Sequence, residues 1–134
     1  MFQGEFRSGS ESPEKPFQLF KIHYKKSGEI LFYFEAGTGK PEYNSNAIYG
    51  RLAAGDSPGH LWYLPKDTTV DCSLDLTIDQ NRLKVLRLKG SSFSNGAVPY
   101  GIYYRVKRSD PGSFIDRSSQ QVYFDKTSPE NYKE

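Results

Sequence analysis

The chain has 134 residues, of which 36% are hydrophobic and 15% aromatic, and its formal net charge is +2. This length fits one domain with a single hydrophobic core. The small net charge excludes the strongly basic balance that is typical of proteins that bind nucleic acids or acidic membranes. No apolar run is long enough to cross a bilayer as a helix. We therefore expect a soluble domain with no nucleic-acid partner and no transmembrane segment.

Segments of strand length follow one another along the chain, separated by turn residues. Alternation is clearest from Val70 to Asp79, where five apolar and five polar residues lie on opposite sides, as in a strand with one buried face. Weaker alternation gives further candidates at residues 2–6, 17–25, 29–36, 46–52, 60–64, 82–88 and 98–106. These short, closely spaced segments predict an all-β fold, an antiparallel eight-stranded meander closed into a small barrel, with a sandwich as the alternative.

The last part of the chain differs from the rest. Ser109-Asp110-Pro111-Gly112 is a strong break. Beyond it, Phe114-Ile115 and Val122-Tyr123-Phe124 are short apolar islands in a polar tail. We predict a barrel domain at residues 1–108 and a C-terminal extension at residues 109–134 that packs on the barrel or trails from it.

Residues that commonly build catalytic or metal sites are sparse. Cys72, the single cysteine, lies on the apolar face of its strand and is interpreted as a buried hydrophobe. The chain has two histidines, which excludes a metal site of three imidazoles. We interpret His23, opposite the apolar face of its strand, as a solvated residue, and His60, beside Trp62 at a strand start, as the better functional candidate. We expect no metal, no cofactor and no enzymatic activity.

Several short motifs carry a resemblance to a known group of proteins. They are Gly4-Glu5-Phe6-Arg7, Ala47-Ile48-Tyr49-Gly50, Cys72-Ser73-Leu74-Asp75-Leu76, Asn81-Arg82-Leu83-Lys84-Val85 and Gly101-Ile102-Tyr103-Tyr104-Arg105. With these motifs, residues 4–107 resemble small extracytoplasmic bacterial β-barrel domains, in particular those of lysozyme-inhibitor-like and other calycin-like envelope lipoproteins. The resemblance implies a binding role and a periplasmic or cell-envelope location, with a cytoplasmic one left open. The disulfide common in such families has no counterpart here, because Cys72 has no mate.

Seven residues are candidate ligand contacts. Six aromatic side chains are expected near the barrel interior, and His60 is expected at its mouth; the six are Phe32, Phe34, Tyr49, Trp62, Tyr100 and Tyr104. We predict a non-catalytic extracytoplasmic binding domain for a protein, such as a lysozyme-type hydrolase, or for a small apolar ligand. Two alternatives are left open. One is a small barrel enzyme with His60 and a carboxylate at the mouth, and the other is a structural module that uses residues 114–124 as an added edge strand.

Overall fold

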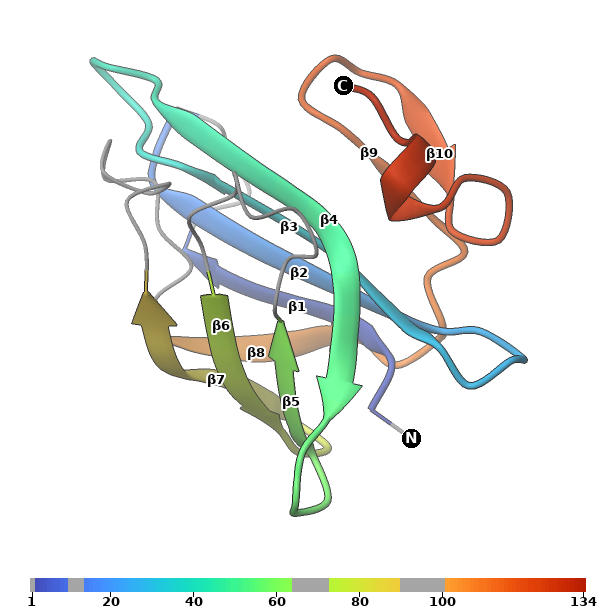
Figure 1. The fold of residues 1–134 in the computed structure, drawn as a ribbon. Helices are drawn as coiled ribbons and strands as arrows, with labels where there is room; N and C mark the ends of the chain where they lie inside the picture. The colour runs from blue at the N-terminus through green and yellow to red at the C-terminus, as the bar shows by residue number, and fades with distance from the viewer. Residues whose placement is uncertain (1, 10–13, 64–72, 90–100) are drawn as a thin grey trace.

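Figure 1 shows the computed structural model, which describes residues 2–9, 14–63, 73–89 and 101–134. Eight antiparallel strands pair in chain order, and β8 pairs with β1, so that the sheet closes into a barrel. They are β1 (Gly4–Gly9), β2 (Phe17–Tyr24), β3 (Ile30–Gly37), β4 (Ser45–Ala54), β5 (His60–Tyr63), β6 (Ser73–Ile78), β7 (Arg82–Lys89) and β8 (Ile102–Lys107). The predicted all-β meander and its closure are confirmed. Cys72 and Tyr100, which the sequence analysis singled out, lie outside the described residues.

The barrel interior is a core of large apolar side chains. The ring of Phe20 lies 5.0 Å from the rings of both Phe34 and Tyr103, centroid to centroid. All eight strands contribute inward-facing residues, namely Phe6, Phe20, Ile22, Ile30, Phe32, Phe34, Ala36, Leu52, Leu61, Tyr63, Leu74, Leu76, Ile78, Leu83, Val85 and Tyr103. Over the described residues, the barrel interior is therefore occupied by the protein's own side chains, as in small barrels.

Gly50 on β4 allows two of these rings to meet. It pairs with Phe32 across β3 and β4, and the Phe32 ring packs edge-on against Tyr63 with 5.0 Å between centroids. A Cβ atom at Gly50 would lie 2.6 Å from Cε1 of Tyr63 and 3.0 Å from Cε1 of Phe32. Both distances are shorter than the usual carbon–carbon contact of about 3.5–4.0 Å. The missing side chain therefore makes room for the aromatic pair.

β8 faces the opposite way from the prediction. The sequence analysis placed Tyr104 near the interior, but its side chain is 60% exposed, and Tyr103 is fully buried. Tyr103 pairs with Leu83 of β7, whose side chain is also fully buried. Because the side-chain period of a strand is two, an inward Tyr103 places Tyr104 outside.

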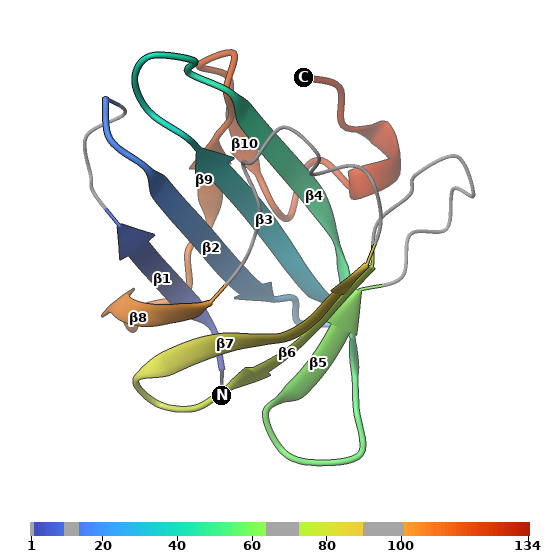
Figure 2. The same ribbon diagram turned by 90° about the vertical axis from the view of Figure 1, so that its left-hand side faces the viewer.

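The extension forms a small second layer on the barrel. It contains β9 (Ser113–Ile115) and β10 (Gln121–Tyr123), which pair antiparallel, and a 3-10 turn (Pro129–Asn131). Figure 2 shows this hairpin beside β2, β3 and β4, and an apolar cluster fills the junction. It consists of Leu31, Tyr33 and Tyr49 from the barrel and Phe114, Val122 and Phe124 from the extension, with Ala47 and Tyr132 against them. Tyr49 therefore lies outside the barrel, and its predicted interior position is wrong.

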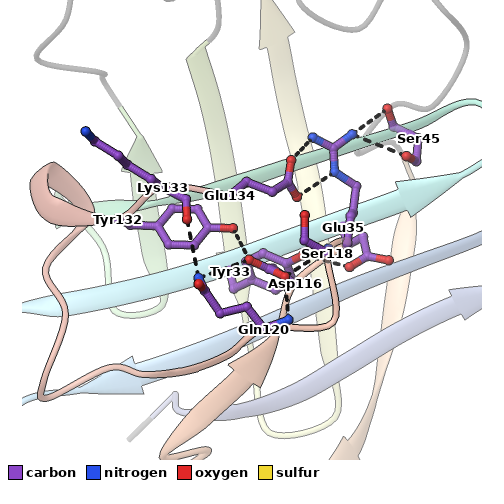
Figure 3. Close-up of polar contacts among 10 residues, drawn as sticks. Tyr33, Glu35, Ser45, Asp116, Ser118, Gln120, Tyr132, Lys133 and Glu134 are labelled. Carbon is purple, nitrogen blue, oxygen red and sulfur yellow. Dashed lines mark hydrogen bonds and ion pairs between the residues drawn. The ribbon is translucent and has the colours of Figure 1, made fainter.

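Asp116 organises the turn between β9 and β10 (Figure 3). Its carboxylate is buried and accepts hydrogen bonds from the backbone N–H groups of Ser118 and Gln120, each at 2.9 Å, and from the Tyr132 hydroxyl at 2.8 Å. Because a buried carboxylate without donors is costly, these three bonds explain how Asp116 is tolerated there. They also hold the end of the chain against the hairpin.

His23 is buried by the same extension, so its interpretation as a solvated residue is wrong. Only 6% of the residue is exposed. Its Nδ1 lies 2.7 Å from a carboxylate oxygen of Asp110, and its Nε2 lies 3.0 Å from a carboxylate oxygen of Asp125. The outward parity of His23 was inferred correctly, but the extension covers that part of the outer wall.

Candidate functional site

The described residues cover the outer wall of the barrel on one side only. The extension lies over β2, β3 and β4, whereas no described element lies over the outer face of β5 to β8 (Figures 1 and 2). We call this open surface the β5–β8 face. It carries most of the large apolar side chains that the structure exposes, namely Trp62, Leu86, Ile102, Tyr104 and Val106.

Four of these side chains form what we call the apolar patch: Leu86, Ile102, Tyr104 and Val106. Their exposed fractions are 51%, 39%, 60% and 49%. Two of the four are the extra residues of β-bulges. In β7, residues 85 and 87 pair with consecutive residues of β6, which leaves Leu86 between them unpaired. In β8, residues 105 and 107 pair with consecutive residues of β1, which leaves Val106 unpaired. Bulges redirect side chains, and here both leave an apolar residue in solvent.

Cations flank the apolar patch along the sheet. Tyr104 pairs with Arg82 of β7 on one side and with Arg7 of β1 on the other. Ile102 pairs with Lys84, so an ammonium group lies beside the patch as well. Since directly paired residues point to the same face and have Cβ atoms about 4.5–5.5 Å apart, an apolar contact on this patch is close to positive charge.

A pocket of about 190 Å³ opens beside the patch, and we call it the Lys84 pocket. Its lining residues are Thr77, Asp79, Arg82, Lys84 and Ile102. Asp79 is engaged by the turn between β6 and β7, where the backbone N–H groups of Asn81 and Arg82 donate to its carboxylate at 2.8 and 2.7 Å. These two bonds hold the pKa of Asp79 below its usual range. Within the described part of the chain, Lys84 forms no ion pair.

His60 lies further along the same face, next to a carboxylate. Its Nε2 is hydrogen-bonded to the carboxylate of Asp75 on β6, as the enzyme alternative requires. The other ring nitrogen is turned to the backbone, because a Cβ atom on Gly55 would lie 2.1 Å from Nδ1. A general base needs one nitrogen within reach of the proton it removes, and about 30% of the His60 side chain is exposed.

Trp62 also lies on the β5–β8 face, so its predicted interior position is wrong. The inward residues of β5 are Leu61 and Tyr63, which belong to the barrel core. Trp62, between them, is 36% exposed and donates its indole N–H to the carbonyl of Ala54 at 3.4 Å. It pairs with Asp75, so it extends the open surface toward β5.

A second cleft, of about 320 Å³, lies where the barrel meets β9. Arg7, Lys21 and Glu35 supply its charges, and Phe17, Leu19, Phe114 and Ile115 supply apolar walls. Its two cations share one partner, because the buried Glu5 carboxylate lies 2.9 Å from Arg7 Nε and 3.7 Å from Lys21 Nζ. Lys21 also donates to the Ser113 carbonyl at 3.3 Å. These contacts join the extension to the barrel.

The predicted site residues therefore do not form one cluster. Phe32 and Phe34 are fully buried in the core, and Tyr49 lies beneath the extension. His60, Trp62 and Tyr104 share the β5–β8 face but belong to different parts of it. Leu86 and Val106 could not be found from the sequence, because alternation along one strand does not mark a bulge. Ile102 was missed because it shares the outer face with Tyr104, which was expected inside.

Comparisons with protein-family models, curated proteins and solved structures find no match for this chain. Among the described residues, no helix has the length and apolar character needed to span a membrane. The described residues also contain no group of three or more His, Cys, Asp or Glu side chains able to hold a metal ion. Functional inference therefore rests on the geometry of the described surface.

Proposed function

We propose that the protein is a non-catalytic binding domain that recognises a protein partner through the apolar patch on β7 and β8. The exposure of Leu86, Ile102, Tyr104 and Val106 on one face carries this proposal. Burying apolar surface is the main favourable contribution to most protein–protein association, and contiguous exposed apolar side chains with a polar rim are typical of interaction sites. The flanking cations Arg82 and Lys84 favour a partner with an acidic surface.

The packed interior supports a surface site over a ligand held inside the barrel. Phe20, Phe32 and Phe34 are fully buried. The centroid of the Phe20 ring lies 6.1 Å from that of Phe32 and 5.0 Å from that of Phe34. A small apolar ligand would have to displace such rings, and protein cores are close-packed.

The test is affinity capture with matched variants. The double variant Ile102→Thr, Tyr104→Thr removes the centre of the patch. The control variant Ile115→Thr, Tyr123→Thr removes an exposed isoleucine and an exposed tyrosine from the extension. We expect the wild-type protein and the extension variant to capture a partner that the patch variant does not capture. This partner, once purified, should form a stoichiometric complex with the purified wild-type protein. A partner retained equally by all three proteins would contradict the proposal.

Purified lysozyme is the first defined protein to test, because the resemblance of residues 4–107 implies such a partner. Inhibition of its hydrolytic activity by wild type, and not by Ile102→Thr, Tyr104→Thr, would identify the partner class. Inhibition that survives this double variant would place the contact elsewhere and contradict the patch as the binding site.

A further inference from the structure

We propose that the Lys84 pocket is a subsite for a carboxylate side chain of the partner, so that the partner presents an acidic residue next to a large apolar one. This inference rests on the proposed function and specifies the chemistry of its site. The pocket combines two cations, Arg82 and Lys84, with the hydroxyl of Thr77 and the apolar wall of Ile102. A carboxylate accepts hydrogen bonds from all three polar groups.

The charge balance of the pocket favours an added anion. Asp79 is the one acidic side chain among the described residues that line it, and that carboxylate already accepts from two backbone N–H groups and lies 3.7 Å from Arg82 Nε. Lys84 forms no ion pair in the described part of the chain. An incoming carboxylate therefore meets a cation that no described side chain neutralises.

The register sets the spacing of the partner residues. Lys84 lies directly across from Ile102, and Tyr104 is two residues further along β8 on the same face. In an extended segment, side chains two residues apart share a face and are about 6.6–6.8 Å apart. A partner segment with Asp or Glu two positions from an aromatic or aliphatic residue matches both the pocket and the apolar patch.

Single-stranded nucleic acid is the other macromolecule that cations beside an exposed tyrosine can bind. The formal net charge of +2 and the four apolar side chains of the patch favour a protein. A fluorescent thymidine oligonucleotide is the probe for this alternative. Its binding to wild type, with loss in Lys84→Glu, would overturn the carboxylate subsite.

The main experiment selects random displayed peptides on the immobilised wild-type protein and measures the affinity of an enriched synthetic peptide. We expect Asp or Glu two positions from a large apolar residue. We expect Lys84→Glu to weaken binding about three- to tenfold, and added salt to weaken it as well. Lys26→Glu, which reverses an exposed lysine in the turn between β2 and β3, is the control and should bind as wild type does.

The outcomes separate the two proposals. If the enriched peptides lack acidic residues, and Tyr104→Thr weakens their binding while Lys84→Glu does not, the patch stands and the carboxylate subsite is wrong. If Tyr104→Thr does not weaken any enriched peptide, the proposed function itself fails. Equal weakening by Lys84→Glu and Lys26→Glu would show only a general charge effect and would overturn the subsite.

Discussion

The imidazole of His23 lies parallel to the ring of Phe124, with 5.0 Å between the centroids and 11° between the planes. The stacked rings join β2 of the barrel to the residue that follows β10. Both ring nitrogens of His23 also face carboxylates of the extension, from Asp110 at 2.7 Å and Asp125 at 3.0 Å. A carboxylate accepts a hydrogen bond from a ring N–H, so His23 links β2 to the segments on both sides of the hairpin.

Replacing His23 should loosen the extension. His23→Asn removes the stacked ring and at least one of the two hydrogen bonds to the carboxylates. We expect the free energy of unfolding to fall by about 1–3 kcal/mol, the usual range for hydrogen bonds of a charged, buried group. Urea unfolding measures it. His60→Asn is the control, because that pair is about 30% exposed and should cost less than about 1 kcal/mol. Equal losses in the two variants would contradict the prediction.

The change in the free energy of unfolding as the pH is lowered should depend on Asp125. The hydrogen bond from His23 holds the pKa of Asp125 below its usual range, and the charges of His23, Lys25 and Lys26 add to this effect. A carboxyl whose folded-state pKa is depressed stabilises the fold above its unfolded-state pKa, about 3.9, and that contribution is lost as pH falls through the folded-state value.

We therefore expect wild type to be more stable than Asp125→Asn at neutral pH, with a difference that shrinks in acid below about pH 4. The difference will be small, because 68% of the Asp125 side chain is exposed. Urea unfolding at a series of pH values measures it, with Asp56→Asn in an exposed loop as the control. A difference that grows in acid would have the wrong sign for this pairing.

The contrast between the barrel and His23 shows what the sequence can predict. Alternation is a local property, so a strand such as β6 can be predicted from the residues that compose it. The number of predicted strands and the short turns between them then indicate a closed barrel. The partners of His23 lie 87 and 102 residues away, in a tail whose placement no local pattern indicates. The extension therefore buries His23, a residue that points outward from the barrel.

The candidate site was predicted less well, also for a physical reason. Residues 102–106 alternate clearly, but alternation does not say which side is the core. Pairing with the fully buried Leu83 turns Tyr103 inward, and that choice places Ile102 and Tyr104 outside. The bulges at Leu86 and Val106 are visible only in the register with the neighbouring strands.

Gly50→Ala should destabilise the barrel. The added methyl group would collide with the rings of Phe32 and Tyr63, which have core neighbours on their other sides. Overpacking of this kind typically costs about 1–3 kcal/mol in the free energy of unfolding. Gly112→Ala is the matched control, because a Cβ atom there meets no atom within 4 Å. A Gly50→Ala protein as stable as Gly112→Ala would show that the rings rearrange freely.

Phe114 should anchor the extension. It is 1% exposed, and its ring stacks on Tyr33 with 4.0 Å between centroids and 8° between planes. Phe114→Ala should lower the free energy of unfolding by about 3–5 kcal/mol, through lost burial and the cavity left behind. The neighbouring Ile115 is 62% exposed, so Ile115→Ala should change it by less than about 0.5 kcal/mol. If urea unfolding gives similar free energies for both variants, the packing of the hairpin on the barrel contributes little to stability.

The apolar patch should contribute to binding and not to stability. Ile102 and Tyr104 point to solvent, with exposed fractions of 39% and 60%, and threonine is a β-branched residue that suits a strand. Ile102→Thr, Tyr104→Thr should therefore change the free energy of unfolding by less than about 1 kcal/mol, about 0.5 kcal/mol for each surface position. It should abolish partner capture at the same time. A loss of several kcal/mol in urea unfolding would instead mean that these side chains pack on the protein itself, and the patch would then be part of the fold.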